Sequence, residues 1–277
     1  MGLRINTNIS SLSAQRALGQ TRNNLDNNFR KLSTGERVTR AADDAAGLAI
    51  SEKLKAHIRG VRQAKRNADD GISLIQTAEG GLNEVSNIII RLRELAIQAA
   101  SDTVGDTERG FSNIEFQQLK NELQRISEGA EFNGRKLLNG EGGFVDIQVG
   151  IHNDPTLDRI TYDSGSVDAS LEALGLTAES IADKSGAQLS LQKLDDALVR
   201  TNGARANLGA LQNRLQSAVN TLGITDENYS AANSRIRDVD VAAETADMTR
   251  NNILASAGVS VLSQANQAPQ AALKLLG

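Results

Sequence analysis

The most regular feature of this sequence is a long stripe of apolar positions between residues 50 and 99. Its members are alternately four and three residues apart, which is the 3.5-residue period of a coiled-coil seam. They are Ile50, Leu54, His57, Val61, Ala64, Ala68, Gly71, Ile75, Ala78, Leu82, Val85, Ile89, Leu92, Ala96 and Ala99, and only His57 is polar. Because each helical residue rises about 1.5 Å, the stripe predicts one helix on the order of 80 Å long.

A second stripe of the same period begins at Leu194 and keeps its register to Ala246. Its members are Leu194, Ala197, Thr201, Ala204, Leu208, Leu211, Leu215, Ala218, Leu222, Tyr229, Ala232, Ile236, Val239, Ala243 and Ala246. A shorter stripe follows a break at residues 104–106 and comprises Phe116, Leu119, Leu123, Ile126 and Ala130. No single helix can bury such a stripe alone, so we expect the three helices to form an antiparallel bundle.

The helical period stops between residues 139 and 186, where seven glycines interrupt the chain. Val145, Ile147 and Val149 alternate with polar residues, and Ile160 and Tyr162 alternate in the same way after a turn at residues 153–155. Alternation followed by turn residues predicts a small β-hairpin. We expect this hairpin to cap one end of the helical bundle.

Both ends of the chain have their own coiled-coil pattern. Leu18, Leu25 and Leu32 recur every seven residues near the start. The stripe near the finish comprises Leu254, Gly258, Val261, Ala265, Ala268, Ala272 and Leu275. Its register is displaced by about one residue from the stripe that ends at Ala246, so we expect a bend or a change of partner, and a domain boundary, at residues 247–252.

The last helix is unusual because residues 251–273 contain no charged side chain, although they are rich in Asn, Gln and Ser. So many amides exclude insertion into a membrane. An exposed helix normally carries charges on its outer face, so a neutral helix of small residues favours close packing against other subunits or around a channel. A frayed polar tail is the alternative.

Composition supports a helical assembly over a compact globule. Aromatic residues make up only 3% of the chain and there is no Trp or Cys, so the core is aliphatic and lacks disulfides and thiolate metal sites. No apolar run approaches the roughly 18 residues of a membrane span, and the first residues contain no signal-peptide segment. We therefore expect neither membrane insertion nor classical secretion.

Charge is unevenly distributed along the chain. Residues 1–66 hold 13 Lys and Arg against 5 Asp and Glu, whereas the remainder holds 17 against 29. A nucleic-acid-binding surface would concentrate basic residues on one face among stacking aromatics, but only Phe29 lies among these basic residues. The pattern argues against nucleic acid as a partner.

The sequence contains no arrangement typical of an active site, a cofactor site or a metal site. Adjacent carboxylates such as Asp43 and Asp44 diverge by about 100° on a helix, and this pair follows a break where carboxylates cap a helix N-terminus. Neither His57 nor His152 begins a zinc-protease H-E-x-x-H motif. We expect His57 to hydrogen-bond within the bundle and the protein to be non-enzymatic.

Four segments resemble the bacterial flagellin family. They are INTN at residues 5–8, RVTRAADDAAGLAISEKL at 37–54, SRIRDVDVAAETADMTRNNIL at 234–254 and QANQAPQAALKLL at 264–276. The resemblance covers most of the chain and implies a short form that lacks the large outer domains of many flagellins. The fold it implies is mainly α, a long coiled-coil-like bundle with paired N- and C-terminal helices and a small β-hairpin region.

The resemblance also implies a domain arrangement and an assembly. Residues 1–43 and 235–277 would form an inner filament domain, and residues 44–234 an outer helical bundle that includes a hairpin and loop region at about 140–186. The polymerisation interface would comprise Leu18, Leu25, Leu32, Leu254, Val261, Ala265 and Leu275. We expect a helical homopolymer in an extracellular filament, with sibling flagellins as further possible members.

Other partners follow from the same resemblance. They are the hook-associated junction and cap proteins, the flagellar type III export apparatus, and a chaperone that holds residues 252–277 in the cytoplasm. A hook-filament junction protein, which resembles flagellin at both ends, is the alternative function. The family's surface for an innate-immune Toll-like receptor maps onto Arg91, Leu95 and Glu115, although Leu95 could instead pack in the bundle and Arg91 pair with Glu residues.

Overall fold

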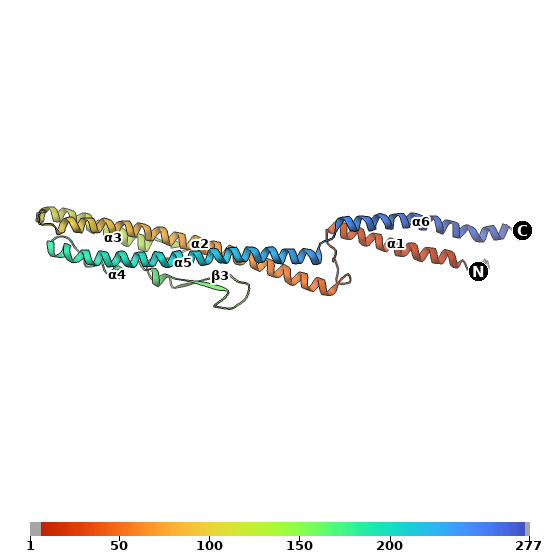
Figure 1. The fold of residues 1–277 in the computed structure, drawn as a ribbon, viewed down its shortest axis with the longest axis horizontal. Coiled ribbons are helices and arrows are strands. Elements are labelled where there is room, and N and C mark those ends of the chain that lie inside the picture. The colour runs from red at the N-terminus through yellow and green to blue at the C-terminus, as the bar shows by residue number, and fades with distance from the viewer. Residues whose placement is uncertain (1–6, 275–277) are drawn as a thin grey trace. The chain divides into compact units, whose positions relative to one another are not determined.

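The computed structural model describes residues 7–274 and is mainly helical (Figure 1). The helices are α1 (Ile9–Thr34), α2 (Ala45–Ala100), α3 (Asp106–Gly129), the single turn α4 (Leu171–Leu174), α5 (Lys184–Arg237) and α6 (Val241–Lys274). The strands are β1 (Glu131–Phe132), β2 (Arg135–Lys136), β3 (Phe144–Gln148) and β4 (Arg159–Asp163), and a short 3-10 turn, η1, spans Ser164–Val167. The predicted fold class, mainly α with a small β region, is confirmed.

The chain divides into two compact units. Unit 2 spans residues 57–227, and unit 1 contains the residues before and after it. The division therefore falls within α2 and α5, further from the chain ends than the boundaries at residues 43/44 and 234/235 that the sequence suggests. None of the described helices is long and apolar enough to cross a membrane.

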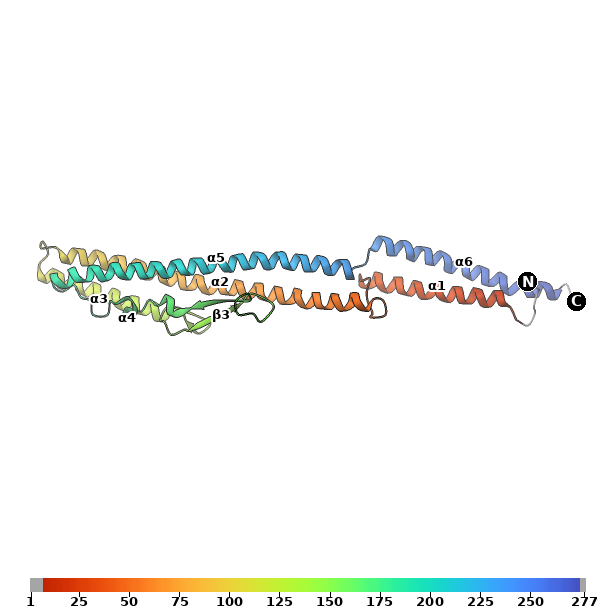
Figure 2. The same ribbon diagram turned by 60° about the horizontal axis from the view of Figure 1, so that its bottom comes forward.

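Unit 2 is held together by the long apolar stripes. Within it, α2, α3 and α5 lie side by side (Figures 1 and 2). Every member of the α2 stripe from Val61 to Ala99 is buried. They meet the buried α5 residues Leu194, Ala197, Thr201, Ala204, Leu208 and Leu215 and the α3 residues Phe116 and Leu123. Alanine in these positions lets the helices approach closely, and the predicted three-helix bundle is confirmed.

The turn between α2 and α3 is closed by a buried arginine. The Arg109 guanidinium donates to the carbonyl oxygens of Ala99 at 2.8 Å and Ser101 at 2.9 Å, and to Asp106 at 2.7 Å. It satisfies carbonyl groups that the end of α2 leaves without helical partners. Arg109 therefore stabilises the turn that contains the predicted break.

A two-residue hairpin joins β1 to β2, and sequence analysis had not predicted it. Asn133 and Gly134 both have positive φ, at 50° and 77°, which is the conformation that an Asn-Gly hairpin turn requires. The Asn133-Gly134 dipeptide is the sequence signal from which this hairpin could have been predicted. The hairpin leads directly into Leu137 and Leu138, which are fully buried.

The second hairpin forms as predicted but in a different place. Val145 pairs with Tyr162, and Ile147 pairs with Ile160. The hairpin packs along the side of α2 instead of capping an end of the bundle. A Cβ atom at Gly71 would lie 2.6 Å from Ile147 Cδ1, so the absence of a side chain there allows this close approach.

Unit 1 contains α1 and α6 side by side and antiparallel, together with the start of α2 and the end of α5 (Figure 1). The helical break lies at residues 238–240, because Asp240 Oδ1 accepts the N–H groups of Ala242 and Ala243 and so starts α6 there. The predicted bend at residues 247–252 is therefore wrong, since α6 runs through that segment without interruption.

Candidate assembly surface of the terminal helices

The contact face of α1 follows a 3.5-residue period. Leu18 is buried, and Leu25 and Leu32 are half-buried, so all three predicted leucines lie on this face. The full set of buried or half-buried seam positions is Ser11, Ala14, Leu18, Thr21, Leu25, Asn28 and Leu32. Two of the three fully buried members, Ser11 and Asn28, are polar, so the pairing depends on hydrogen bonds as well as on apolar burial.

The facing positions of α6 are Glu244, Met248, Asn251, Ala255, Gly258, Leu262 and Ala265, which we name the contact seam. Four of them, each seven residues from the next, meet α1 directly. Glu244 and Asn251 hydrogen-bond Asn28, and a Cβ on Gly258 would lie 3.3 Å from Leu18 Cδ1. The Ala265 carbonyl accepts from Asn8 Nδ2 at 2.7 Å. Apart from Met248 and Leu262, the residues of the contact seam are small or polar.

This arrangement differs from the α6 seam that the sequence suggests. Ala265 and Gly258 belong to both seams, but Leu254 and Val261 are 50% and 54% exposed. These two residues therefore are not buried against α1 within one chain. Leu275 lies outside the described residues.

Several large apolar side chains of unit 1 remain exposed. In α1 they are Ile9, Leu12 and Phe29, each about half exposed, and in α6 they include Ile253 at 65% and Val259 at 52%. The part of α6 that carries these side chains, beyond Arg250, is the uncharged segment of the sequence. A surface with exposed apolar groups and no charge is typical of an interaction site.

The segments that link the terminal helices to α2 and α5 are joined to each other. Arg37 N–H donates to the Arg237 carbonyl at 2.6 Å, and Val239 N–H donates to the Gly35 carbonyl at 3.0 Å. The Arg237 guanidinium also forms ion pairs with Glu36 at 2.8 Å and Glu52 at 2.5 Å. These hydrogen-bonded carboxylates raise the Arg237 pKa, so the guanidinium stays charged.

The adjacent carboxylates of Asp43 and Asp44 accept hydrogen bonds from the backbone next to the start of α2, and Asp44 caps that helix as the sequence suggests. Asp44 Oδ1 accepts the Gly47 N–H at 2.8 Å at the start of α2. Asp43 accepts the Arg40 N–H at 3.0 Å and the Thr39 hydroxyl at 3.0 Å. These two hydrogen bonds lower the pKa of the Asp43 carboxyl. Both carboxylates have structural partners.

The predicted receptor residues are only partly brought to the surface. The Arg91 guanidinium pairs with Glu115 at 2.8 Å and with Glu94 at 2.9 Å, and all three side chains are exposed. Hydrogen bonds from Glu115 and then Glu94 raise the Arg91 pKa. Leu95 is 3% exposed and belongs to the bundle core, so its placement on that surface has to be corrected.

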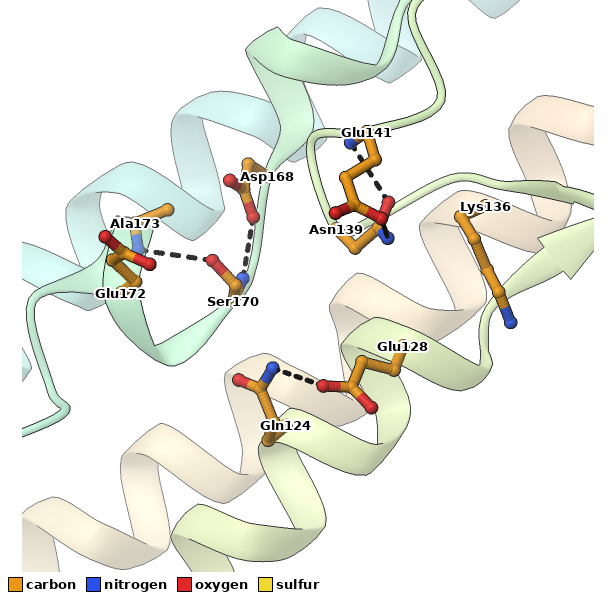
Figure 3. A pocket seen from close by; sticks show the side chains of 9 residues that line it. All are labelled: Gln124, Glu128, Lys136, Asn139, Glu141, Asp168, Ser170, Glu172 and Ala173. Atoms are coloured by element: carbon orange, nitrogen blue, oxygen red, sulfur yellow. Dashed lines mark hydrogen bonds between the residues drawn. The ribbon is translucent and has the colours of Figure 1, made fainter.

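A cleft on unit 2 brings carboxylates together without a reactive arrangement. It has a volume of about 700 Å³ and its lining includes four carboxylates, from Glu128, Glu141, Asp168 and Glu172 (Figure 3). Glu128 is bonded to Gln124 at 2.7 Å, and Asp168 accepts the Ser170 N–H at 2.8 Å. No group of three or more potential metal ligands occurs among residues 7–274.

The two histidines of the chain lie next to each other, although they are 95 positions apart in the sequence. The His57 and His152 rings meet edge to face with centroids 6.1 Å apart. His57 therefore contacts the loop that follows β3, which its place in the α2 stripe did not predict. This contact fastens the β3–β4 loop to α2.

Comparison with known proteins accounts for both helical ends. Residues 5–142 match the model of the bacterial flagellin N-terminal helical region. Residues 191–276 match the model of the bacterial flagellin C-terminal helical region. The segment between them, which contains β3, β4 and α4, lies outside both matches.

Similar proteins span almost the whole chain. A flagellin of Halalkalibacterium halodurans is 46% identical over 98% of this chain and 99% of its own length. A protein of Treponema phagedenis named flagellar filament 33 kDa core protein is 42% identical over 98% and 99%. The crystal structure of Bacillus cereus flagellin matches with a TM-score of 0.51 and 31% identity, over 57% of this chain and 88% of that one. With both family models and near-complete relatives in agreement, this chain belongs to the bacterial flagellin family.

Proposed function

We propose that this chain is a structural subunit that polymerises through α1 and α6 into the extracellular helical filament used for swimming. The observation that carries the proposal is the row of half-exposed apolar side chains on a helix pair whose C-terminal part is uncharged. The name of the Treponema relative, a flagellar filament core protein, supports it. The family is one of structural proteins, and an enzymatic role finds no support in the site.

Repeating one contact between identical chains generates such a filament. A heterologous contact that does not close on itself builds an open helix. Full burial of a Leu or Val side chain stabilises by about 1.5–3 kcal/mol, so a half-exposed side chain gains roughly half of that when a neighbour covers it. Leu254 and Val261, exposed by about half, supply this gain on α6.

The assembly surface can be tested with Val261→Asp. A carboxylate buried without a partner in an uncharged seam costs several kcal/mol, so elongation from seeds should fall by at least about a hundredfold. The bundle of unit 2 should keep its helical circular dichroism. Seeded growth, followed by electron microscopy and light scattering, measures the effect.

Val241→Asp is the matched control, because Val241 is similarly exposed, at 59%, but begins α6 beside Asp240. A carboxylate is favourable at a helix N-terminus, so this variant should assemble. Filaments of normal length from Val261→Asp would refute the assigned surface.

Ordering of the chain ends should be coupled to assembly. The α1 seam has only three fully buried residues, which is little to offset the roughly 1–2 kcal/mol per residue of backbone ordering. In dilute monomer, amide hydrogens of residues 1–43 and 235–277 should therefore exchange quickly, and in filaments they should be protected. Residues 44–234 should be protected in both states. Equal protection of the ends in monomer and filament would mean that they fold independently, contrary to this mechanism.

Export is part of the proposal. We infer that the chain leaves through the flagellar type III apparatus, unfolded and without cleavage, and that a chaperone holds residues 252–277 beforehand. The exposed apolar side chains of α6 support this, because they would promote premature assembly in the cytoplasm. Mass spectrometry of shed filaments should find the full sequence, apart from Met1 removal. A processed N-terminus would exclude this route.

We also propose that the monomer is sensed by an innate-immune Toll-like receptor through the exposed Arg91–Glu115 pair. The side chains of Arg91 and Glu115 are 50% and 47% exposed, and their helices are held by the buried bundle core. Leu95 would act beneath this surface by positioning α2.

The receptor proposal can be tested by removing the Arg91–Glu115 ion pair and, as a control, a second exposed Arg–Glu pair. Arg91→Ala with Glu115→Ala should reduce activation of a receptor reporter cell by purified monomer at least about tenfold, since a charged contact contributes roughly 1.5–3 kcal/mol. Arg125→Ala with Glu122→Ala removes another exposed pair, on α3, and should not change activation. Silence of the unsubstituted monomer would eliminate the receptor proposal.

The alternative function is a hook-filament junction protein, which would form only a short ring. Seeded growth of the unsubstituted chain separates the two, because a filament subunit gives long tubes. In the filament reading, the junction and cap proteins contact only the first and last subunits, and sibling flagellins could share the lattice.

A further inference from the structure

Helix α6 carries two overlapping seams, and only one of them faces α1. The contact seam includes Asn251, Ala255 and Leu262, whereas Leu254 and Val261 form a second stripe, which we name the outer stripe. Both share Gly258 and Ala265. At 3.6 residues per turn, the outer stripe lies roughly 60–80° around the helix from the middle of the contact seam.

Apolar burial alone does not explain which seam is used. Between residues 251 and 265, the contact seam supplies one large apolar residue, Leu262, and one amide, Asn251. The outer stripe supplies Leu254 and Val261 over the same length. A helix that paired only by hydrophobic burial would turn the outer stripe towards α1.

A polar cluster at one level of the pair favours the contact seam. Asn28, which is 6% exposed, donates to Glu244 Oε1 at 2.6 Å and accepts from Asn251 Nδ2 at 3.0 Å. Lys31 Nζ lies 3.4 Å from the same Glu244 carboxylate. Glu244 and Asn251 are seven residues apart, so a rotation of α6 would remove both from Asn28 together. The amide of Asn28 would then be buried without a partner.

We infer that this cluster of Asn28, Lys31, Glu244 and Asn251 selects the rotational setting of α6 on α1 and so keeps the outer stripe exposed. A buried Asn in a coiled-coil seam is known to specify register at a cost in stability. Here the cost leaves Leu254 and Val261 available to a second copy of the chain. This last step rests on the proposed function, whereas the choice of seam does not.

The choice of seam can be measured by disulfide formation, because the chain has no cysteine of its own. Leu18 lies opposite Gly258, and the two helices are antiparallel. Thr21, one turn after Leu18, therefore lies at the same height along the pair as residues 254 and 255. The terminal helices of the dilute full-length chain pair transiently, and a disulfide traps the seam in which they meet. Thr21→Cys with Ala255→Cys should therefore form an intrachain disulfide on the order of tenfold faster than Thr21→Cys with Leu254→Cys. Adding Asn28→Leu and Asn251→Leu should abolish or reverse this preference.

Two further variants keep the outcome interpretable. Glu244→Ala removes one acceptor only and should reduce the preference partway, even if the double leucine variant folds poorly. Asn23→Leu with Asn252→Leu places the same residues at exposed positions of the same helices and should leave the preference unchanged. Equal rates in the unsubstituted background, or an unchanged preference in the double leucine variant, would overturn the inference.

Filament growth is scored separately. If the seam switches and growth falls, the cluster controls the surface that assembles. If the seam switches and growth is normal, the cluster still selects the seam, and the assignment of the outer stripe to assembly is wrong.

Discussion

The seam between α1 and α6 joins the two ends of the chain and decides which side chains of unit 1 stay exposed. It is built largely from small and polar side chains, with Leu18 opposite Gly258 and Asn28 opposite Asn251. Such a seam brings the helix backbones close together but buries little apolar area. Larger apolar side chains, such as Ile253 and Leu254, remain exposed on the pair.

The two units are stabilised by different interactions. In unit 2, the aliphatic stripes of α2, α3 and α5 form one buried core, with Leu119, Ile126 and Leu211 partly buried at its margin, so that part of the chain is stabilised by its own packing. In unit 1, hydrogen bonds select the arrangement and leave the larger side chains unburied. In the proposed assembly, specificity within the chain and affinity between chains reside in different residues of α6.

The 3.5-residue period predicted the bundle of unit 2 well, because each stripe there packs against the other helices of the same chain. From Val61 to Ala99 the positions that repeat are the positions that pack, and every one is buried. The β3–β4 hairpin followed from alternation in the same way. Its place along α2 was not predictable. Gly71 fits the α2 stripe as a small residue, and nothing near it in the sequence shows that the Ile147 side chain, from β3, packs against it.

The candidate surface was predicted only in part, for a reason that the structure makes clear. A search for apolar repeats finds the most hydrophobic face of α6, but the face that meets α1 is chosen by Asn28 and Glu244, which are 216 positions apart. Their pairing has no local signature. The same holds for Leu95, whose burial depends on helices from three parts of the chain, whereas Arg91 and Glu115 are exposed and paired with each other.

The hydrogen bonds between the segments that follow α1 and precede α6 bear on how far the length of the intervening chain can vary. The hydrogen bond from Arg37 to the Ile236 carbonyl closes a loop across 199 positions of sequence. The entropy lost in closing a long loop grows only with the logarithm of its length, by about 0.6 kcal/mol for each doubling. Adding residues at the exposed tip of the β3–β4 loop would therefore weaken the meeting of the chain ends very little. The segment between the two helical halves is free to lengthen or shorten while the ends keep the same partners.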